Sequence, residues 1–230
     1  MKTLVIISHP NILESSSQQF LMHAIPENDG ITIHHLEDAY PDGKIDVAKE
    51  HTLLREHDRI IFQFPFYWYS SPAMLKQWQD DVLTDGFAIG KNGSTLYGKE
   101  FGLVFAVGIR EQEYQAGGRE LFSISELMRP FQAMAYKTGM TYIKPLPIYQ
   151  FGYMTDGEKL QLVITYLQML SADKDLTLRA KENWILEQLN KTNKATLQEK
   201  DVHIIDHAID RIKENRETME ELRIVLDEMN

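Results

Sequence analysis

Short apolar, β-branched runs alternate with stretches of helical periodicity over most of the chain. The runs predict five strands, at residues 3–8, 31–36, 59–64, 101–107 and roughly 141–149. The intervening stretches predict helices at residues 16–25, 46–57, 73–82, 124–138 and 158–170. This alternation favours right-handed βαβ units, and therefore an α/β fold with a doubly wound, five-stranded parallel sheet. The glycine-rich segment 86–98 is predicted to be a long irregular loop.

The composition changes from about Ser171, where apolar β-formers become sparse and charged residues dominate. Residues 175–189 and 200–229 are predicted to be helical, with a break at residues 190–193. One face of the second helix alternates spacings of three and four, at Ile205, Ala208, Ile212, Asn215, Met219, Leu222, Leu226 and Met229. This stripe suits a helix lying on its own domain as well as a coiled coil between subunits, because alanine and asparagine weaken the seam. We therefore expect a first domain at residues 1–170 and a C-terminal helical extension at residues 171–230.

Composition narrows the class of protein. The chain has 230 residues and a net charge of −10, which argues against nucleic acid as the main partner. The apolar run from Leu4 to Ile7 is too short for a signal peptide, and no run approaches the length of a membrane span. The chain has no cysteine, which excludes disulfides, thiol nucleophiles and thiolate metal sites. We expect a cytoplasmic protein that does not insert into membranes.

The segment Ile60–Trp78 is expected to begin as a buried strand and to end as a helix. Pro65 is expected to stop the strand, and one of Ser70–Ser71 to cap the helix, with Pro72 in its first turn. Between them lie four consecutive aromatic residues, Phe66, Tyr67, Trp68 and Tyr69. They fall where open α/β sheets bind ligands, at the carboxyl end of a strand. The four aromatics therefore either pack into the core or form a platform for a flat ligand.

A serine-rich helix start follows the first strand. The strand ends in Ser8-His9-Pro10, and the next helix begins with Ser15, Ser16, Ser17 and Gln18. Unpaired N–H groups at a helix N-terminus, joined by hydroxyls, suit a phosphate group. The same serines could be ordinary helix caps, and His9 a hydrogen-bonded structural histidine. The sequence has no glycine-rich dinucleotide fingerprint or Walker motif, and its other histidines show no metal-ligand spacing.

Three predicted loops should meet at one edge of the sheet. In a doubly wound sheet of flavodoxin order, the first, third and fourth strands lie side by side. The loop after the fourth strand contains Gly108, Ile109 and Arg110. A phosphate at the serine-rich turn and a flat ring between the other two loops describe a bound flavin mononucleotide.

Further motifs occur in order at Leu36, Tyr40-Pro41-Asp42, Ile45-Asp46, Leu75-Lys76, Asp80, Gly86-Phe87-Ala88, Leu96, Gly98-Lys99, Arg129-Pro130-Phe131-Gln132 and Gly139-Met140. With the turns above, they make residues 1–170 resemble the flavodoxin-like NAD(P)H quinone reductases. That family includes bacterial soluble NAD(P)H oxidoreductases, general stress proteins and potassium-efflux ancillary flavoproteins. The resemblance implies that the flavin phosphate and ribityl chain are held by His9, Ser15, Ser17 and Gln18. It also implies that the ring edge is contacted by Pro65, Phe66, Tyr67, Trp68 and Tyr69.

The resemblance assigns roles after the fourth strand as well. Where the family usually has Thr-Thr-Gly-Gly, this chain has Val107, Gly108, Ile109 and Arg110, which changes how closely the backbone can approach the ring. Tyr114 falls where the family carries a tyrosine or histidine near the ring, and Arg119 where some relatives carry a histidine. Either side chain could stabilise negative charge that develops on the flavin as a hydride arrives. Arg119 could equally be a solvated surface residue.

The resemblance implies a flavoenzyme that transfers a hydride from NADH or NADPH to FMN or FAD, and then two electrons to a quinone or similar flat acceptor. Donor and acceptor would use one pocket in turn, in a ping-pong scheme, and the protein would be a homodimer with Trp68 near the partner. An alternative is a flavin-binding ancillary subunit of a membrane transporter, which docks through the C-terminal helices. A third possibility, prompted by residues 107–110, is a fold that has lost its flavin.

Overall fold

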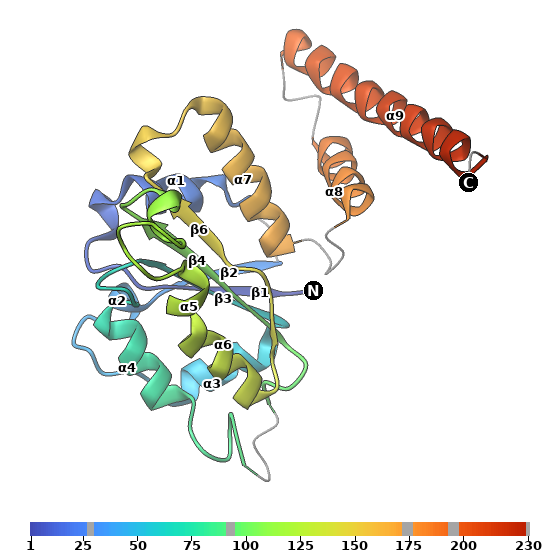
Figure 1. The fold of residues 1–230 in the computed structure, drawn as a ribbon. Helices are drawn as coiled ribbons and strands as arrows, with labels where there is room; N and C mark the ends of the chain where they lie inside the picture. Colours follow the sequence, from blue (N-terminus) through green and yellow to red (C-terminus); the bar gives the residue numbers. More distant parts are fainter. Residues whose placement is uncertain (27–29, 91–94, 172–176, 193–197, 229–230) are drawn as a thin grey trace. The chain divides into compact units, whose positions relative to one another are not determined.

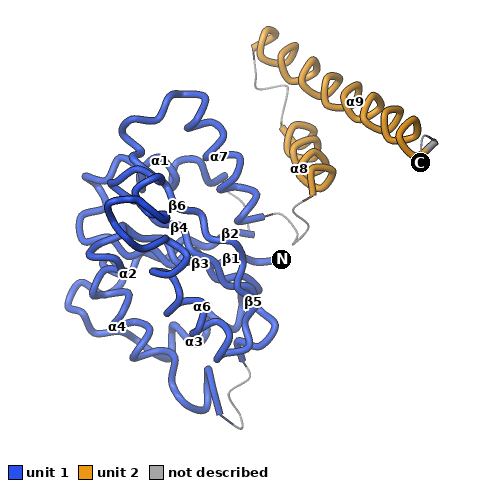
Figure 2. The backbone as a smooth tube through the Cα atoms, in the orientation of Figure 1, with its two compact units in different colours: residues 1–171 blue, residues 172–230 orange. Residues whose placement is uncertain are grey.

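The computed structural model describes residues 1–26, 30–90, 95–171, 177–192 and 198–228. The chain divides into two compact units, residues 1–171 and residues 172–230 (Figure 2). The first unit is a parallel sheet covered by helices on both faces (Figure 1). The second unit contains two helices within its described residues.

The sheet has six strands: β1 Thr3–Ile7, β2 Ile31–His35, β3 Arg59–Pro65, β4 Glu100–Val107, β5 Thr141–Tyr142 and β6 Leu146–Tyr149. Their order is β2-β1-β3-β4-β5, and β6 also pairs with β4, beyond the end of β5. All of these pairings are parallel. The order confirms the predicted doubly wound fold, and it brings the carboxyl ends of β1, β3 and β4 to one edge.

The helices of the first unit are α1 Ser16–Ala24, α2 Leu36–Ala39, α3 Val47–Glu56, α4 Ala73–Val82, α5 Ile124–Leu127, α6 Arg129–Thr138 and α7 Asp156–Ser171. Alternate strand residues enter two separate cores because successive side chains point to opposite faces. Leu4 and Ile6 pack with residues of α3, α4 and α6, whereas Val5 and Ile7 pack with residues of α1 and α7. These four side chains are fully buried, so the sheet is the central layer of three.

The predicted fifth strand is wrong in one respect, because it forms two short strands rather than one. The ladder with β4 continues as far as Ile143, whose N–H donates to the carbonyl of Phe101 at 2.9 Å. Pro145 has no N–H to continue it, and pairing resumes only at β6. Prediction of a single helix at residues 124–138 is wrong for a related reason. Pro130 lies in the first turn of a new helix that begins at Arg129, so the segment divides into α5 and α6.

The ends of the aromatic segment also differ from the prediction. Pro65 belongs to β3, and the N–H of Phe66 extends the ladder by donating to the carbonyl of Ala106 at 2.9 Å. Pro72 is itself the N-cap of α4, and neither preceding serine caps the helix. Ser70 pairs instead with Tyr67 through their backbones. The short helix α2, which follows β2 directly, was not anticipated.

The second unit consists of α8 Leu178–Lys191 and α9 Glu199–Glu228 within the described residues. Arg216 of α9 donates to Glu182 at 3.2 Å and to Asn183 at 2.9 Å, so this residue ties α9 to α8. The predicted break began too early, because residues 190–191 are still helical; residues 175, 193 and 229 lie outside the described residues. Three members of the predicted stripe are more than half exposed within this unit, Met219, Leu222 and Leu226.

Candidate functional site

Loops after four neighbouring strands line the carboxyl edge of the sheet. They follow β1, β3, β4 and β6. Trp68, Tyr69, Leu121 and Gln150 are the non-glycine residues with positive φ in the described part of the chain, and all four lie in these loops. Left-handed backbone costs a non-glycine residue roughly 1–2 kcal/mol, and such strain concentrates at functional sites. The strained positions thus point to this edge as the functional site.

The turn after β1 is braced by a carboxylate that the sequence did not indicate. Glu37 of α2 accepts from the hydroxyl of Ser8 at 2.7 Å and from the backbone N–H of His9 at 3.0 Å. His35 lies 3.1 Å from Glu37, contacts the carbonyl oxygen of His9 at 3.1 Å, and lies 2.9 Å from Asp38. Burial alone would lower the pKa of His35, but its bonds to these two carboxylates outweigh burial and raise the pKa to about 9. A cationic His35 therefore holds the turn in place at neutral pH.

His9 is buried and held in one tautomer. Its Nδ1 accepts the N–H of Asn11 at 3.1 Å, so the neutral ring carries its proton on Nε2. Burial lowers the pKa of His9, although the charge of Glu37 opposes the shift. The ring is therefore neutral at pH 7, and its Nε2–H is a hydrogen-bond donor. Its centroid lies 6.5 Å from that of Tyr67, which joins the β1 turn to the aromatic loop.

The start of α1 offers several donors in one place. Ser15 is the N-cap, and its Oγ accepts the N–H of Gln18 at a long 3.5 Å and lies 3.4 Å from the hydroxyl of Ser17. The first N–H groups of a helix have no partner within it, and the helix dipole favours an anion there. Gln18 is fully buried, and its side-chain Nε2 has no hydrogen-bond partner among the described residues. A buried donor without a partner is costly, so this atom fits a ligand oxygen.

The aromatic residues after β3 form a tight hairpin, which we call the aromatic hairpin (Tyr67–Ser70). The N–H of Tyr67 donates to the carbonyl of Ser70 at 3.0 Å, and the reverse bond is 2.9 Å long. The central residues have φ of 46° for Trp68 and 62° for Tyr69, the signs of a type I′ turn. Trp68 is 93% exposed, so the core alternative is wrong for this residue.

Phe66 packs against the aromatic hairpin, and Tyr114 packs against Phe66. The ring of Phe66 lies 6.2 Å from Tyr69, 5.6 Å from Phe105 and 6.0 Å from Tyr114. Tyr114 is 7% exposed, and its ring also lies 6.5 Å from that of Tyr149. Burial raises the pKa of Tyr114, and the nearby Glu120 and Tyr69 raise it further. Tyr114 therefore keeps its hydroxyl proton and can act as a donor.

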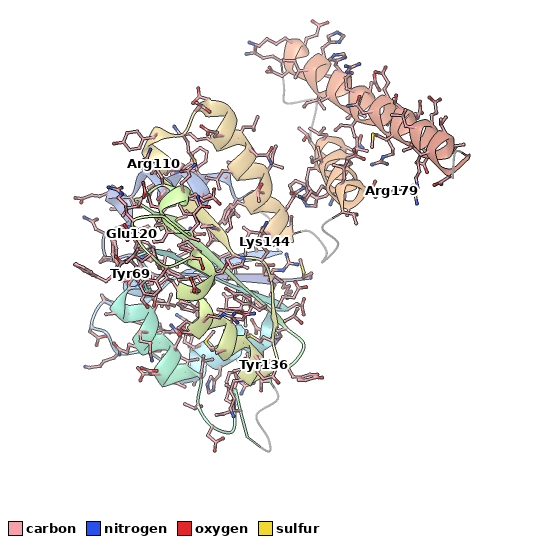
Figure 3. All side chains as sticks on the ribbon, viewed as in Figure 1. Tyr69, Arg110, Glu120, Tyr136, Lys144 and Arg179 are labelled. Atoms are coloured by element: carbon pink, nitrogen blue, oxygen red, sulfur yellow. The ribbon has the colours of Figure 1, made fainter. Side chains whose placement is uncertain are left out.

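The loop after β4 carries the predicted arginines, and both are paired with one carboxylate. Glu113 lies 3.2 Å from the guanidinium of Arg110 and 3.1 Å from that of Arg119. Hydrogen bonds from the backbone and side chain of Arg119 lower the pKa of Glu113, so it stays ionised. Glu120 accepts the hydroxyl of Tyr69 at 2.9 Å and links this loop to the aromatic hairpin (Figure 3). The structure thus pairs both Arg110 and Arg119 with Glu113, and it places the ring of Tyr114 next to that of Phe66.

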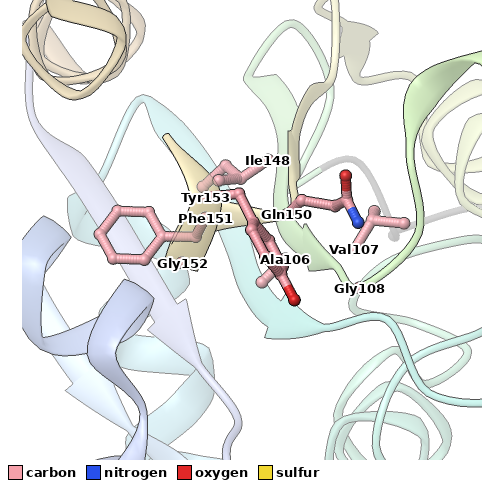
Figure 4. Close-up of a pocket in the computed structure, with 8 residues that line it drawn as sticks. All are labelled: Ala106, Val107, Gly108, Ile148, Gln150, Phe151, Gly152 and Tyr153. Atoms are coloured by element: carbon pink, nitrogen blue, oxygen red, sulfur yellow. The ribbon is translucent and has the colours of Figure 1, made fainter. Parts of the chain in front are cut away.

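An open pocket of about 260 Å³ lies where β4 and β6 end (Figure 4). Its lining is largely apolar and consists of Ala106, Val107, Gly108, Ile148, Gln150, Phe151, Gly152 and Tyr153. A Cβ at Gly108 would meet no described atom within 4 Å, so the space beside this residue is open to a ligand. The residues after β6 were missed because no charge, serine cluster or aromatic run marks them in the sequence.

These features fit a flavin mononucleotide. The start of α1, with the buried Gln18 amide, suits its phosphate, and the exposed aromatic hairpin with Gly108 suits a flat ring. His9, Ser15 and Ser17 are brought to the first location, and Pro65, Phe66 and the hairpin to the second. The described residues contain no cluster of three or more His, Cys, Asp or Glu side chains that could hold a metal ion. None of the described helices has the length and apolar character needed to cross a membrane.

The sheet order and the ligand-binding edge define a flavodoxin-like α/β protein. The chain matches the family described as having a flavodoxin-like fold over residues 1–168, and it belongs to that family. This confirms the fold that the sequence predicted and the family to which the motifs pointed.

Several relatives carry names that bear on chemistry. The chain is 52% identical over 143 residues to the uncharacterized NAD(P)H oxidoreductase YrkL of Bacillus subtilis, covering 62% of this chain and 82% of that one. It is 40% identical over 148 residues to the glutathione-regulated potassium-efflux system ancillary protein KefG of Cronobacter sakazakii, covering 64% and 80%.

Two solved structures are similar along nearly their whole length. An NADPH-quinone reductase of P. pentosaceus superposes with a TM-score of 0.70 at 43% identity, covering 74% of this chain and 98% of that one. The general stress protein 14 of Treponema denticola, solved in complex with FMN, superposes with a TM-score of 0.68 at 36% identity, with the same coverage. Residues 1–168, which match the flavodoxin-like family, contain all four loops of the candidate site.

Proposed function

We propose that this protein is an FMN-dependent NAD(P)H oxidoreductase that passes two electrons to a quinone or a similar flat acceptor. The main support is the convergence of an anion-binding helix start and an exposed aromatic hairpin at one sheet edge, where His9 and Tyr67 lie 6.5 Å apart. The FMN complex of a 36% identical structure and the NAD(P)H oxidoreductase name of a 52% identical relative support the same assignment.

When bound, FMN would supply the redox chemistry, accepting a hydride from the nicotinamide and then delivering two electrons to the acceptor. The protein's task is to bind, orient and shield. Ser15, Ser17, Gln18 and the start of α1 would hold the phosphate, with the neutral His9 donating through Nε2. The aromatic hairpin would present a flat, apolar surface to the ring and to the stacked substrates.

Tyr114 is the described residue best placed to assist charge development. Its hydroxyl stays protonated, and its ring is fixed by Phe66 and Tyr149, so it can donate to an oxygen or nitrogen that gains negative charge. Arg119 is already paired with the carboxylate of Glu113, at 3.1 Å. We therefore assign the donor role to Tyr114 and give Arg119 the smaller one.

The visible spectrum of the purified protein, followed by extraction and identification of the flavin, tests this proposal directly. We expect a yellow protein that releases FMN on denaturation, and bleaching when NADH or NADPH is added without oxygen. Rates with each nicotinamide and with a short-chain quinone then define donor and acceptor. A colourless protein that does not bind added FMN would instead support a fold that has lost its flavin.

A second candidate function is that of an ancillary subunit of a membrane transporter. Two observations favour it: the 40% identity to KefG, and an α8–α9 unit that lies outside the matched residues 1–168 and exposes Met219, Leu222 and Leu226. Removal of residues 172–230 separates the possibilities. Loss of a transporter partner with flavin turnover retained would support the ancillary role. Joint loss of dimer and turnover, measured by sedimentation and steady-state assay, would make the unit part of a homodimeric enzyme.

A further inference from the structure

Three buried polar side chains form a continuous relay from α7 to the start of α1. The hydroxyl of Tyr166 donates to Gln63 Oε1 at 2.6 Å, and Gln63 Nε2 donates to Gln18 Oε1 at 2.6 Å. All three residues are fully buried, and they come from α7, β3 and α1. The relay ends at Gln18 Nε2, the buried donor without a partner among the described residues.

The hydrogen bonds of the relay all run from Tyr166 toward Gln18. Burial raises the pKa of Tyr166, so its hydroxyl keeps its proton and can donate it. Donation to Gln63 Oε1 fixes that amide with its oxygen toward Tyr166 and its NH₂ toward Gln18. Gln18 must then offer its oxygen to Gln63, which leaves its own NH₂ for a third group.

The end of the relay lies beside the helix start. Gln18 is in the first turn of α1, three residues after the N-cap Ser15. Gln63 is at the carboxyl end of β3, and its carbonyl accepts the N–H of Ser8 at 3.0 Å. Gln18 thus belongs to the same helix turn as the N-terminal N–H groups of α1 and the hydroxyls of Ser15 and Ser17, which are donors suited to an anion.

We propose that Gln63 and Tyr166, which need not touch the ligand, are positioning residues that keep the Gln18 amide oriented as a donor to a phosphate ester. Without the Tyr166 hydroxyl, the Gln63 amide can rotate by half a turn and offer its oxygen to Gln18. Gln18 would then turn as well and present an oxygen to the phosphate, which repels it. The inference rests on the proposed FMN function and adds two residues that are distant in sequence from the phosphate site.

The experiment compares Tyr166→Phe with the wild type in the full-length protein stripped of flavin. Titration with FMN, followed by quenching of flavin fluorescence, gives the affinity. We expect a loss of about tenfold, the size of one hydrogen bond to a charged group. Riboflavin, which lacks the phosphate, should bind wild type and Tyr166→Phe equally well. The same loss should appear when inorganic phosphate is the probe, followed by ³¹P NMR.

Two further variants separate positioning from a structural effect. In a Gln18→Ala background, Tyr166→Phe should have no further effect on FMN affinity, because the relay then has nothing to orient. Tyr142→Phe is the matched control, since the Tyr142 hydroxyl is also buried and has no partner among the described residues. Tyr142 pairs with Phe101 near the amino end of β4, away from the phosphate site, so FMN affinity should be unchanged.

The outcomes distinguish the relay from the function. FMN affinity within twofold of wild type in Tyr166→Phe, or an equal loss in the Gln18→Ala background, overturns the relay and leaves the proposed function intact. Loss of riboflavin binding to the same extent as FMN also overturns it. A wild type that binds phosphate with the predicted Tyr166 dependence but no flavin upholds the relay and overturns the function. A wild type that binds neither probe overturns both.

Discussion

Truncation of the exposed indole of Trp68 should leave stability nearly unchanged while lowering acceptor turnover. Trp68 is 93% exposed, so only about 7% of an area of roughly 200 Å², or about 15 Å², is buried. Truncation to alanine removes at most this buried area. At about 25 cal/mol per Å², Trp68→Ala should cost only about 0.4 kcal/mol. Trp68→Gly should be more stable than Trp68→Ala, because glycine adopts the observed φ of 46° without the left-handed penalty of roughly 1–2 kcal/mol.

Trp78 provides the matched comparison within the same segment. It is 1% exposed, and its indole N–H donates to Glu50 at 2.8 Å, so Trp78→Ala should cost about 3–5 kcal/mol. Urea denaturation of flavin-free protein measures both values, and turnover per bound flavin with a quinone measures function. A loss of more than about 2 kcal/mol in the free energy of unfolding of Trp68→Ala would show that the indole is packed. Unchanged turnover per bound flavin would show that the aromatic hairpin is not a substrate platform.

Three more predictions concern the loops at the same edge. The double variant His9→Ala and Ser15→Ala should release flavin on dialysis, since each lost hydrogen bond to the phosphate costs about 1.5–3 kcal/mol of binding free energy, whereas the free energy of unfolding should change little. Full flavin occupancy after dialysis would show that the phosphate binds elsewhere. Tyr114→Phe should slow flavin bleaching by NADPH in rapid mixing. The activation free energy should rise by less than the roughly 2.7–4 kcal/mol that a donor supplies in a water-excluded site, because the flavin edge would face solvent; slowing only in Arg119→Ala would move the role to the arginine. The pKa of His35 is raised from 6.5 to about 9, so the charged His35 should stabilise the fold. This stabilisation should be fully present below pH 6.5 and should be lost as the pH rises through 9. Between pH 6 and pH 10, the free energy of unfolding should fall by up to about 3 kcal/mol more in the wild type than in His35→Gln, and solvent screening at the exposed Asp38 reduces this difference. An equal pH dependence in both proteins would show that the charged His35 does not stabilise the turn.

Much of the candidate site could be predicted from the sequence. The serine-rich turn, the aromatic run and the loop at Gly108 each follow a predicted strand, and parallel strands in a doubly wound order bring those loops together. The identity of the pairing partners could not be predicted. Glu113 forms ion pairs with both predicted arginines, and Glu120 accepts a hydrogen bond from Tyr69. A charged residue on a surface loop does not reveal these partners in the sequence.

The sequence by itself determined the main alternation of strands and helices, because hydrophobic periodicity is local. It did not reveal the short helix α2 or the division of the fifth strand and of the helix at residues 124–138. It also indicated that the loops after the first, third and fourth strands reach the carboxyl edge, but it did not indicate the loop after β6. Only the tertiary structure decided that Trp68 is exposed while Trp78 is buried, since both lie in one apolar segment. It likewise decided the relay, whose members Gln18, Gln63 and Tyr166 are 45 and 103 residues apart. Burial and long-range hydrogen bonding depend on which elements pack together, and that information is held by the fold rather than by any local pattern.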